Sequence, residues 1–174
     1  IDLDLAVLPG FRDSYQGPAF GDVPSEWDIH FSFAFVRDPY TRLISGWKMF
    51  TQGTTRIEKT SPELSIHQFL DIIEDELIVY DERRSHYTER IRHHMIPQTH
   101  PFNCLKMAKF VGRFESLQED FDFVCEQIGI PRQTLPRLHR SHEPATSIHL
   151  DKRHIQRINN LYKDDFNLLN YPMR

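Results

Sequence analysis

The stretch that decides the fold runs Phe33-Ala-Phe-Val-Arg37-Asp-Pro-Tyr-Thr-Arg-Leu-Ile-Ser45-Gly-Trp47. It continues an apolar and aromatic run from Ile29 to Val36, which is long enough for a buried strand but too short for a helix. Asp38 then offers an N-cap oxygen, and Pro39 stands at the first helical position, where proline is best tolerated. The pattern therefore predicts a strand followed at once by a helix from Pro39 to about Phe50.

The rest of the chain continues this alternation of strands and helices. Strand, helix, strand, helix predicts an α/β fold with a largely parallel sheet, and the lack of repeats and linker tracts predicts one domain over residues 1–174. The signals are capping boxes at Ser65 with Gln68 and at Ser116 with Glu119, a strand at Lys109–Arg113, inward-facing Leu117, Phe121, Val124, Cys125 and Ile128, a helix end at Gly129, and a stripe of Ile155, Ile158, Tyr162 and Phe166 after Asp151.

Composition excludes several classes of function. The formal net charge of −4 argues against a general nucleic-acid binder, which needs a net excess of Lys and Arg. Two cysteines are too few for a disulfide scaffold or a zinc site, so we expect no metal. No run approaches the roughly 20 apolar residues that cross a bilayer, and we expect no membrane contact for this segment.

Arg37 is the best candidate for a binding residue. It follows a buried strand at its C-terminal end, where open α/β sheets bind their ligands. The next residues begin a helix, whose free N–H groups and positive dipole end favour an anion, and a guanidinium can grip phosphate oxygens in a bidentate fork. The residues alone leave two interpretations open: a phosphate site, or an arginine paired with a structural carboxylate beside a capped helix.

This stretch resembles the 3′-phosphate-binding motif of sulfotransferases that use 3′-phosphoadenylyl sulfate (PAPS). That motif is an apolar strand, then Arg-[Asp/Asn/Glu]-Pro, then a serine eight residues after the arginine. Arg37, Asp38, Pro39 and Ser45 match it in register. The resemblance implies that Arg37 and Ser45 contact the 3′-phosphate of PAPS.

Three later segments resemble the carbohydrate sulfotransferases, the group that includes chondroitin and HNK-1 enzymes and bacterial relatives. The resemblance implies a three-layer, P-loop-like fold and transfer of a sulfonyl group to a hydroxyl of a small molecule or glycan. The matching segments are His94-Met-Ile-Pro97-Gln98, Phe110 to Asp120, and Leu161 to Tyr171. A further segment, Leu138-His-Arg-Ser-His142, looks like the family's loop near the nucleotide, which implies cofactor contacts for Arg140 and Ser141.

Sulfonyl transfer needs a base that takes the proton of the acceptor hydroxyl, and histidine or glutamate suits this role. His94 is the first candidate because it stands beside the family-like Pro-Gln pair, and His93 is the second. The competing interpretation of His94 is a surface or structural histidine. For Arg113 and Glu115, which follow a predicted strand, we expect an internal ion pair.

One feature of the family is missing from the sequence: the glycine-rich loop Pro-Lys-[Ala/Thr]-Gly-[Thr/Gly]-[Ser/Thr] that holds the 5′-phosphosulfate. We expect the domain to lack this loop and its strand, which in relatives precede the Arg-Asp-Pro segment. A degenerate, non-catalytic module of the same fold therefore stays an alternative to the enzyme. A nucleotide kinase is disfavoured, because no Gly-Lys-[Ser/Thr] is present. We expect a cytoplasmic protein, or a Golgi enzyme if an anchor precedes Ile1.

Overall fold

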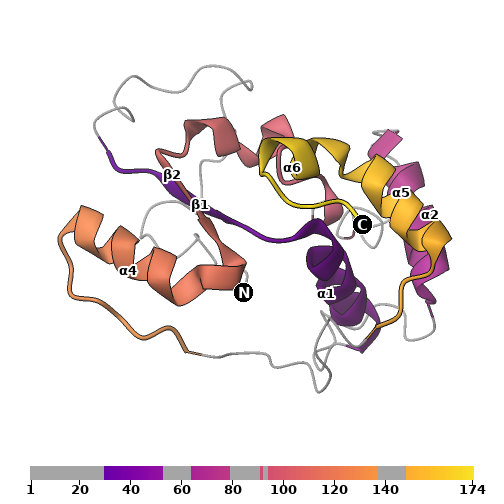
Figure 1. The fold of residues 1–174 in the computed structure, drawn as a ribbon, viewed down its shortest axis with the longest axis horizontal. Coiled ribbons are helices and arrows are strands. Elements are labelled where there is room, and N and C mark those ends of the chain that lie inside the picture. Colours follow the sequence, from indigo (N-terminus) through magenta and orange to yellow (C-terminus); the bar gives the residue numbers. More distant parts are fainter. Residues whose placement is uncertain (1–29, 53–63, 79–90, 92–93, 137–147) are drawn as a thin grey trace, which may run out of the picture.

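The computed structural model of the chain describes residues 30–52, 64–78, 91, 94–136 and 148–174. His93, Arg140 and Ser141 lie outside these residues. The described elements alternate along the chain as the sequence predicts (Figure 1). They are β1 (Phe33–Val36), α1 (Pro39–Gln52), α2 (Ile66–Ile78), η3 (Pro101–Asn103), η4 (Leu105–Met107), β2 (Phe110–Arg113), η5 (Phe114–Ser116), α4 (Leu117–Ile128), α5 (Lys152–Leu161) and α6 (Lys163–Leu168).

The two strands form a parallel pair, in a register that runs from Phe33 opposite Phe110 to Val36 opposite Arg113. In Figure 1, α4 lies on one side of this pair, while α1, α2, α5 and α6 lie together on the other. The mixed α/β class and the parallel pairing are thus confirmed. The first strand is shorter than the Ile29–Val36 run predicts, since β1 begins at Phe33.

Two of the predicted helix starts are confirmed in atomic detail. The Asp38 carboxylate accepts a hydrogen bond from the Thr41 amide (2.9 Å) and so caps α1, with Pro39 at the first position. Ser65 and Gln68 form the reciprocal capping box at α2: the Ser65 amide donates to the Gln68 side chain (2.9 Å), and the Gln68 amide donates to the Ser65 hydroxyl (3.2 Å).

The predicted start and end of α4 are confirmed, with Ser116 at the N-cap position and Gly129 at the C-cap, but the predicted capping box is not formed. Ser116 makes no cap bond, and its hydroxyl donates instead to the Asp120 carboxylate (2.8 Å). Gly129 ends α4 with a left-handed backbone (φ 75°), as predicted. Cys125 is buried, also as predicted, whereas Ile128 is 45% exposed and does not face inward.

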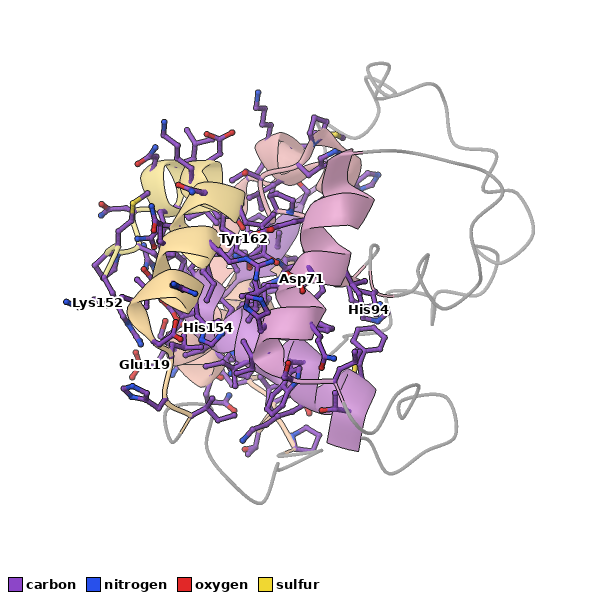
Figure 2. The ribbon with its side chains drawn as sticks, turned by 90° about the vertical axis from the view of Figure 1, so that its right-hand side faces the viewer. Asp71, His94, Glu119, Lys152, His154 and Tyr162 are labelled. Atoms are coloured by element: carbon purple, nitrogen blue, oxygen red, sulfur yellow. The ribbon has the colours of Figure 1, made fainter. Side chains whose placement is uncertain are left out.

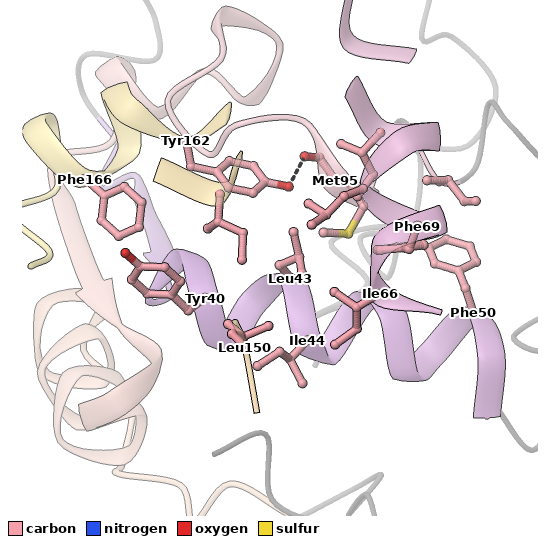
Figure 3. Packing of buried hydrophobic residues seen from close by; sticks show 14 of the residues in the cluster. Tyr40, Leu43, Ile44, Phe50, Ile66, Phe69, Met95, Leu150, Tyr162 and Phe166 are labelled. Atoms are coloured by element: carbon pink, nitrogen blue, oxygen red, sulfur yellow. Dashed lines mark hydrogen bonds between the residues drawn. The ribbon is translucent and has the colours of Figure 1, made fainter. Parts of the chain in front are cut away.

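The main hydrophobic core lies among α1, α2, α5 and α6 (Figure 3). The predicted stripe supplies Ile158, Tyr162 and Phe166, which are buried, although the helix is interrupted at Tyr162 and continues as α6. The Tyr162 hydroxyl donates to the Met95 carbonyl (2.8 Å), so this buried polar group is satisfied.

An ion-pair network joins α5 to α2. The Arg157 guanidinium donates to Glu74 (2.8 Å) and to Asp71 (2.6 Å), and Figure 2 looks onto this side of the molecule with Asp71 labelled. These bonds fix the two helices against each other around the core. Among the described residues, no helix has the length and apolar character needed to span a membrane.

Gly112 is required where α4 packs on the sheet. A Cβ at this position would lie 2.5 Å from the Phe35 ring and 3.0 Å from the Cβ of Asp120. We predict that Gly112→Ala lowers the free energy of unfolding by about 1–3 kcal/mol, because a rigid ring and a helix have to shift. Urea denaturation measures the loss.

Val111→Thr is the matched control, because Val111 is the neighbouring strand residue and is 38% exposed. It should stay within about 0.5 kcal/mol of the parent. Equal stability of Gly112→Ala and the parent would show that α4 does not pack on β2 as described.

Candidate functional site

Arg37 lies directly after the last residue of β1, and its backbone is held by a side chain distant in sequence. Its amide donates to the Gln98 side-chain oxygen (2.8 Å), and its carbonyl accepts from the Gln98 side-chain nitrogen (2.8 Å). The carboxamide of Gln98 thus pairs with Arg37 as the backbone of a neighbouring strand would. This pairing fixes the backbone at the point where β1 gives way to α1.

The Arg37 side chain is half-buried and partly restrained. Its Nε donates to the Thr41 hydroxyl (3.2 Å), and its guanidinium carbon lies 4.4 Å from the centre of the Phe114 ring. Burial lowers the pKa of Arg37, an effect opposed by the charges of Glu115 and Asp38. Within the described part of the chain, the two terminal nitrogens have no hydrogen-bond partner, so they remain able to bind an anion.

Ser45 lies on the same face of α1 as Thr41, because residues four apart on a helix are neighbours on its surface. Arg37, Thr41 and Ser45 therefore follow one another at four-residue spacing, and the first two are joined by the bond from Arg37 Nε. Ser45 is only partly buried. The structure thus gives the arginine and the serine a common side of α1.

The expectation that free amides at the start of α1 would hold an anion is wrong for most of that turn. The Asp38 amide donates to Glu115 (2.8 Å), the Thr41 amide is taken by the cap, and Pro39 has no N–H. An anion at Arg37 would therefore be bound chiefly by side chains. The nearby carboxylates of Asp38 and Glu115 would repel the anion, and the positive charge of Arg37 would offset this repulsion.

The ion pair expected between Arg113 and Glu115 is not formed. Glu115 accepts from the Asp38 amide and from the Tyr171 hydroxyl (2.9 Å), while Arg113 donates to the Leu169 carbonyl (2.8 Å). The guanidinium carbon of Arg113 lies 4.5 Å from the centre of the Tyr171 ring. Burial and the bond to Glu115 raise the pKa of Tyr171. Both residues thus tie the C-terminal segment to the end of the sheet.

A buried carboxylate holds the turn that carries Gln98. Asp165 of α6 is fully buried and accepts from the amides of Gln98 and Thr99 (both 2.8 Å) and from the Thr99 hydroxyl (2.7 Å). The turn closes with a bond from the His100 amide to the Pro97 carbonyl (3.0 Å). The segment that was predicted to be irregular therefore contains an ordered turn at Pro97 to His100, which is held by Asp165 of α6.

His94 is not brought to Arg37. Its ring meets the Phe50 ring edge-on at 5.6 Å, and its carbonyl accepts from Arg42 (2.6 Å). Phe50 is eleven residues past Pro39 in α1, which is about 16 Å along the helix axis. Figure 2 shows His94 on the opposite side of the view from Lys152 and Glu119. Its role as a base stays a prediction.

None of the described residues forms a group of three or more His, Cys, Asp or Glu side chains suited to a metal ion. The site at Arg37 is instead a cationic side chain with neighbouring hydroxyls. That combination suits an oxyanion such as phosphate.

Residues 23–172 match the model of the sulfotransferase family. The chain belongs to the sulfotransferase family. Searches of curated proteins and of solved structures gave no significant match. The family is one of transferases that move sulfonyl groups, generally to hydroxyl-bearing acceptors and with PAPS as the usual donor.

No motif in the sequence predicts the contacts that Gln98 and Asp165 make in this structure. Gln98 belongs to a family-like segment that assigns it no role, and Asp165 belongs to a stretch that predicts only a closing helix. A signal for Asp165 does exist: it is three residues after Tyr162 and next to Phe166, so it falls on the apolar face of that helix. An acid on a core-facing stripe needs internal donors.

We predict that Asp165→Asn lowers the free energy of unfolding by about 1–3 kcal/mol, because either orientation of the new amide turns its NH₂ towards a backbone N–H. Each Asp165 oxygen accepts one such N–H, from Gln98 or from Thr99. Thermal or urea unfolding measures the change. The control is Asp164→Asn, since Asp164 is exposed and should change stability by less than about 0.5 kcal/mol. Equal effects of the two variants would contradict the assigned bonds.

Proposed function

We propose that this sulfotransferase transfers the sulfonyl group of PAPS to a hydroxyl of a carbohydrate, and that Arg37 and Ser45 bind the 3′-phosphate of the donor. The proposal rests on the way Arg37 is held, with its terminal nitrogens left for a ligand. Its backbone is fixed by Gln98, its Nε by Thr41 and its guanidinium face by Phe114, while its terminal nitrogens have no described partner.

The chemistry of this arrangement favours the binding of a phosphate dianion. A partly desolvated guanidinium gains more from an anionic partner than an exposed one does, because the local dielectric is lower. The Ser45 hydroxyl on the same side of α1 offers a further hydrogen-bond donor. We assign Arg140 and Ser141 as additional cofactor contacts on the family resemblance alone.

We also propose the three-layer, P-loop-like architecture for the whole domain. The parallel pair of β1 and β2, with helices on both sides, is consistent with part of such a sheet. In this architecture the 5′-phosphosulfate is held by backbone amides of a glycine-rich loop on another strand. Arg37 and α1 would supply the 3′-phosphate side of the donor site.

The reaction would be an in-line displacement at sulfur. The acceptor oxygen forms a bond to sulfur as the bond from sulfur to the bridging phosphate oxygen breaks, and 3′,5′-phosphoadenosine leaves with that oxygen. The proton of the acceptor hydroxyl passes to a base on the protein, for which we retain His94 as the proposed residue. Positive charge near the leaving nucleotide lowers the barrier.

We predict that Arg37→Ala weakens binding of 3′,5′-phosphoadenosine by at least about tenfold, since a charge-assisted hydrogen bond contributes roughly 1.5–3 kcal/mol. Isothermal titration calorimetry on the complete protein measures the affinity. Arg132→Ala is the control: Arg132 is an exposed arginine that pairs with Glu126, and its loss should leave the affinity unchanged. An unaltered affinity of Arg37→Ala would reject the site.

His94→Gln separates the two interpretations of this histidine. If His94 is the base, kcat falls by about 100-fold or more while the affinity for 3′,5′-phosphoadenosine is unchanged, which is the result we expect. Mass-spectrometric detection of the sulfated glycan gives the rate. An unchanged kcat would reject His94 as the base and favour the structural interpretation, in which its ring packs against Phe50.

The competing proposal, a non-catalytic nucleotide-binding module, makes the same prediction for Arg37→Ala. It differs in turnover, because such a module binds 3′,5′-phosphoadenosine but forms no sulfated product from PAPS. Product formation by the complete protein, with any of a panel of glycans, rejects the module and supports the enzyme.

A further inference from the structure

We propose that Gln98 is a positioning residue that sets the phosphate-binding geometry of Arg37 without touching the ligand, and that Asp165 supports it from α6. This proposal rests on the proposed function, since it assumes a 3′-phosphate at Arg37. It assigns a role to the Pro-Gln turn and to the closing helix that neither the motif nor the family match provides.

The Gln98 carboxamide is fully used by the protein itself. Its oxygen accepts from the Arg37 amide, and its nitrogen donates to the Arg37 carbonyl (2.8 Å) and, more weakly, to Asp165 (3.4 Å). A primary amide has two N–H donors, and both are engaged here. Gln98 therefore has no donor left for a phosphate and acts through Arg37.

The pairing with Gln98 lies where the sheet no longer supports the chain. The register of β1 with β2 ends at Val36 opposite Arg113, so Arg37 has no partner strand in the described structure. Gln98 supplies both missing bonds from a side chain. An acceptor alone or a donor alone would satisfy only one of the two Arg37 groups.

The turn that carries Gln98 is itself held in place by hydrogen bonds to a buried carboxylate. Asp165 accepts the amides of Gln98 and Thr99 and is fully buried, beside the core residue Phe166. A buried, fully bonded carboxylate allows little movement of the turn it holds. The Arg37 backbone is thus linked to the core through Gln98 and α6. Arg37 and Gln98 are 61 residues apart in sequence, and Gln98 and Asp165 are 67 apart.

The consequence is a specific effect on recognition of the 3′-phosphate. A small displacement of the Arg37 backbone moves the guanidinium fork, and misplacement on the order of 1 Å can cost up to about 100-fold in function. Adenosine 5′-phosphate lacks the 3′-phosphate and should not sense this displacement. Selectivity between the two nucleotides therefore reports on the positioning of Arg37.

The test is a double-mutant cycle of Gln98→Met with Arg37→Ala in the complete protein, read by calorimetry with 3′,5′-phosphoadenosine and with adenosine 5′-phosphate. Methionine keeps the length of the side chain and introduces no charge beside the anion. We expect Gln98→Met to lower affinity for the bisphosphate by about tenfold and to leave the affinity for the monophosphate unchanged. In the Arg37→Ala background it should have no further effect.

Two further variants complete the test: one is a control elsewhere in the turn, and the other is a second substitution of Gln98. Asn103→Ala removes bonds from the exposed Asn103 side chain to the Pro97 and Gln98 carbonyls (2.9 and 3.3 Å). It leaves the Asp165 bonds that hold the turn and the pairing of Gln98 with Arg37, so the selectivity should be unchanged. Gln98→Asn keeps the carboxamide but shortens the side chain by one methylene, so it tests the proposal if Gln98→Met does not fold. We expect at least about a threefold loss for the bisphosphate, from the cost of a poorly made hydrogen bond.

The outcomes distinguish the two proposals. If the parent protein does not prefer the bisphosphate, the proposed function fails and this inference fails with it. If the parent prefers it and Arg37→Ala removes the preference, but the Gln98 variants keep it, only the positioning role is overturned. Equal losses for both nucleotides, or additive losses with Arg37→Ala, would also overturn it in favour of general loosening.

Discussion

The chain has two residues in which to leave a strand and enter a helix. β1 ends at Val36 and α1 begins at Pro39, so Arg37 and Asp38 carry the whole transition. Asp38 uses its side chain to cap α1, and Arg37 is held by the Gln98 carboxamide because the strand pairing has ended. This short transition places a cation at the edge of the sheet, and the remaining contacts of the site follow from it.

The supports of this transition come from distant parts of the sequence. The turn at Gln98 rests on Asp165 of α6, and Glu115, just after β2, links the Asp38 amide to Tyr171 near the C-terminus. Burial of Tyr162 and Phe166 in the core fixes α5 and α6, on which these bonds depend. The hydrophobic core and the polar site are therefore coupled, so that changes in the closing helices should reach Arg37.

Local signals in the sequence predicted much of this structure. The cap at Asp38, the box at Ser65 and the glycine after α4 each depend on neighbouring residues, and each is confirmed. The apolar run before Arg37 is confirmed as a strand over Phe33–Val36. The second capping box was wrong because Ser116 had a competing partner, Asp120, which also binds the Arg113 amide (2.5 Å). The Gln98 and Asp165 contacts were not predictable from spacing, because they join residues more than sixty positions apart.

Binding of one phosphate group by both Arg37 and Ser45 can be seen or refuted in a crystal structure of the complete protein with 3′,5′-phosphoadenosine. We expect the 3′-phosphate within hydrogen-bonding distance, about 3 Å, of both the Arg37 guanidinium and the Ser45 hydroxyl. A nucleotide bound with its 3′-phosphate away from these two side chains, or with Arg37 turned to a carboxylate instead, would contradict the assignment.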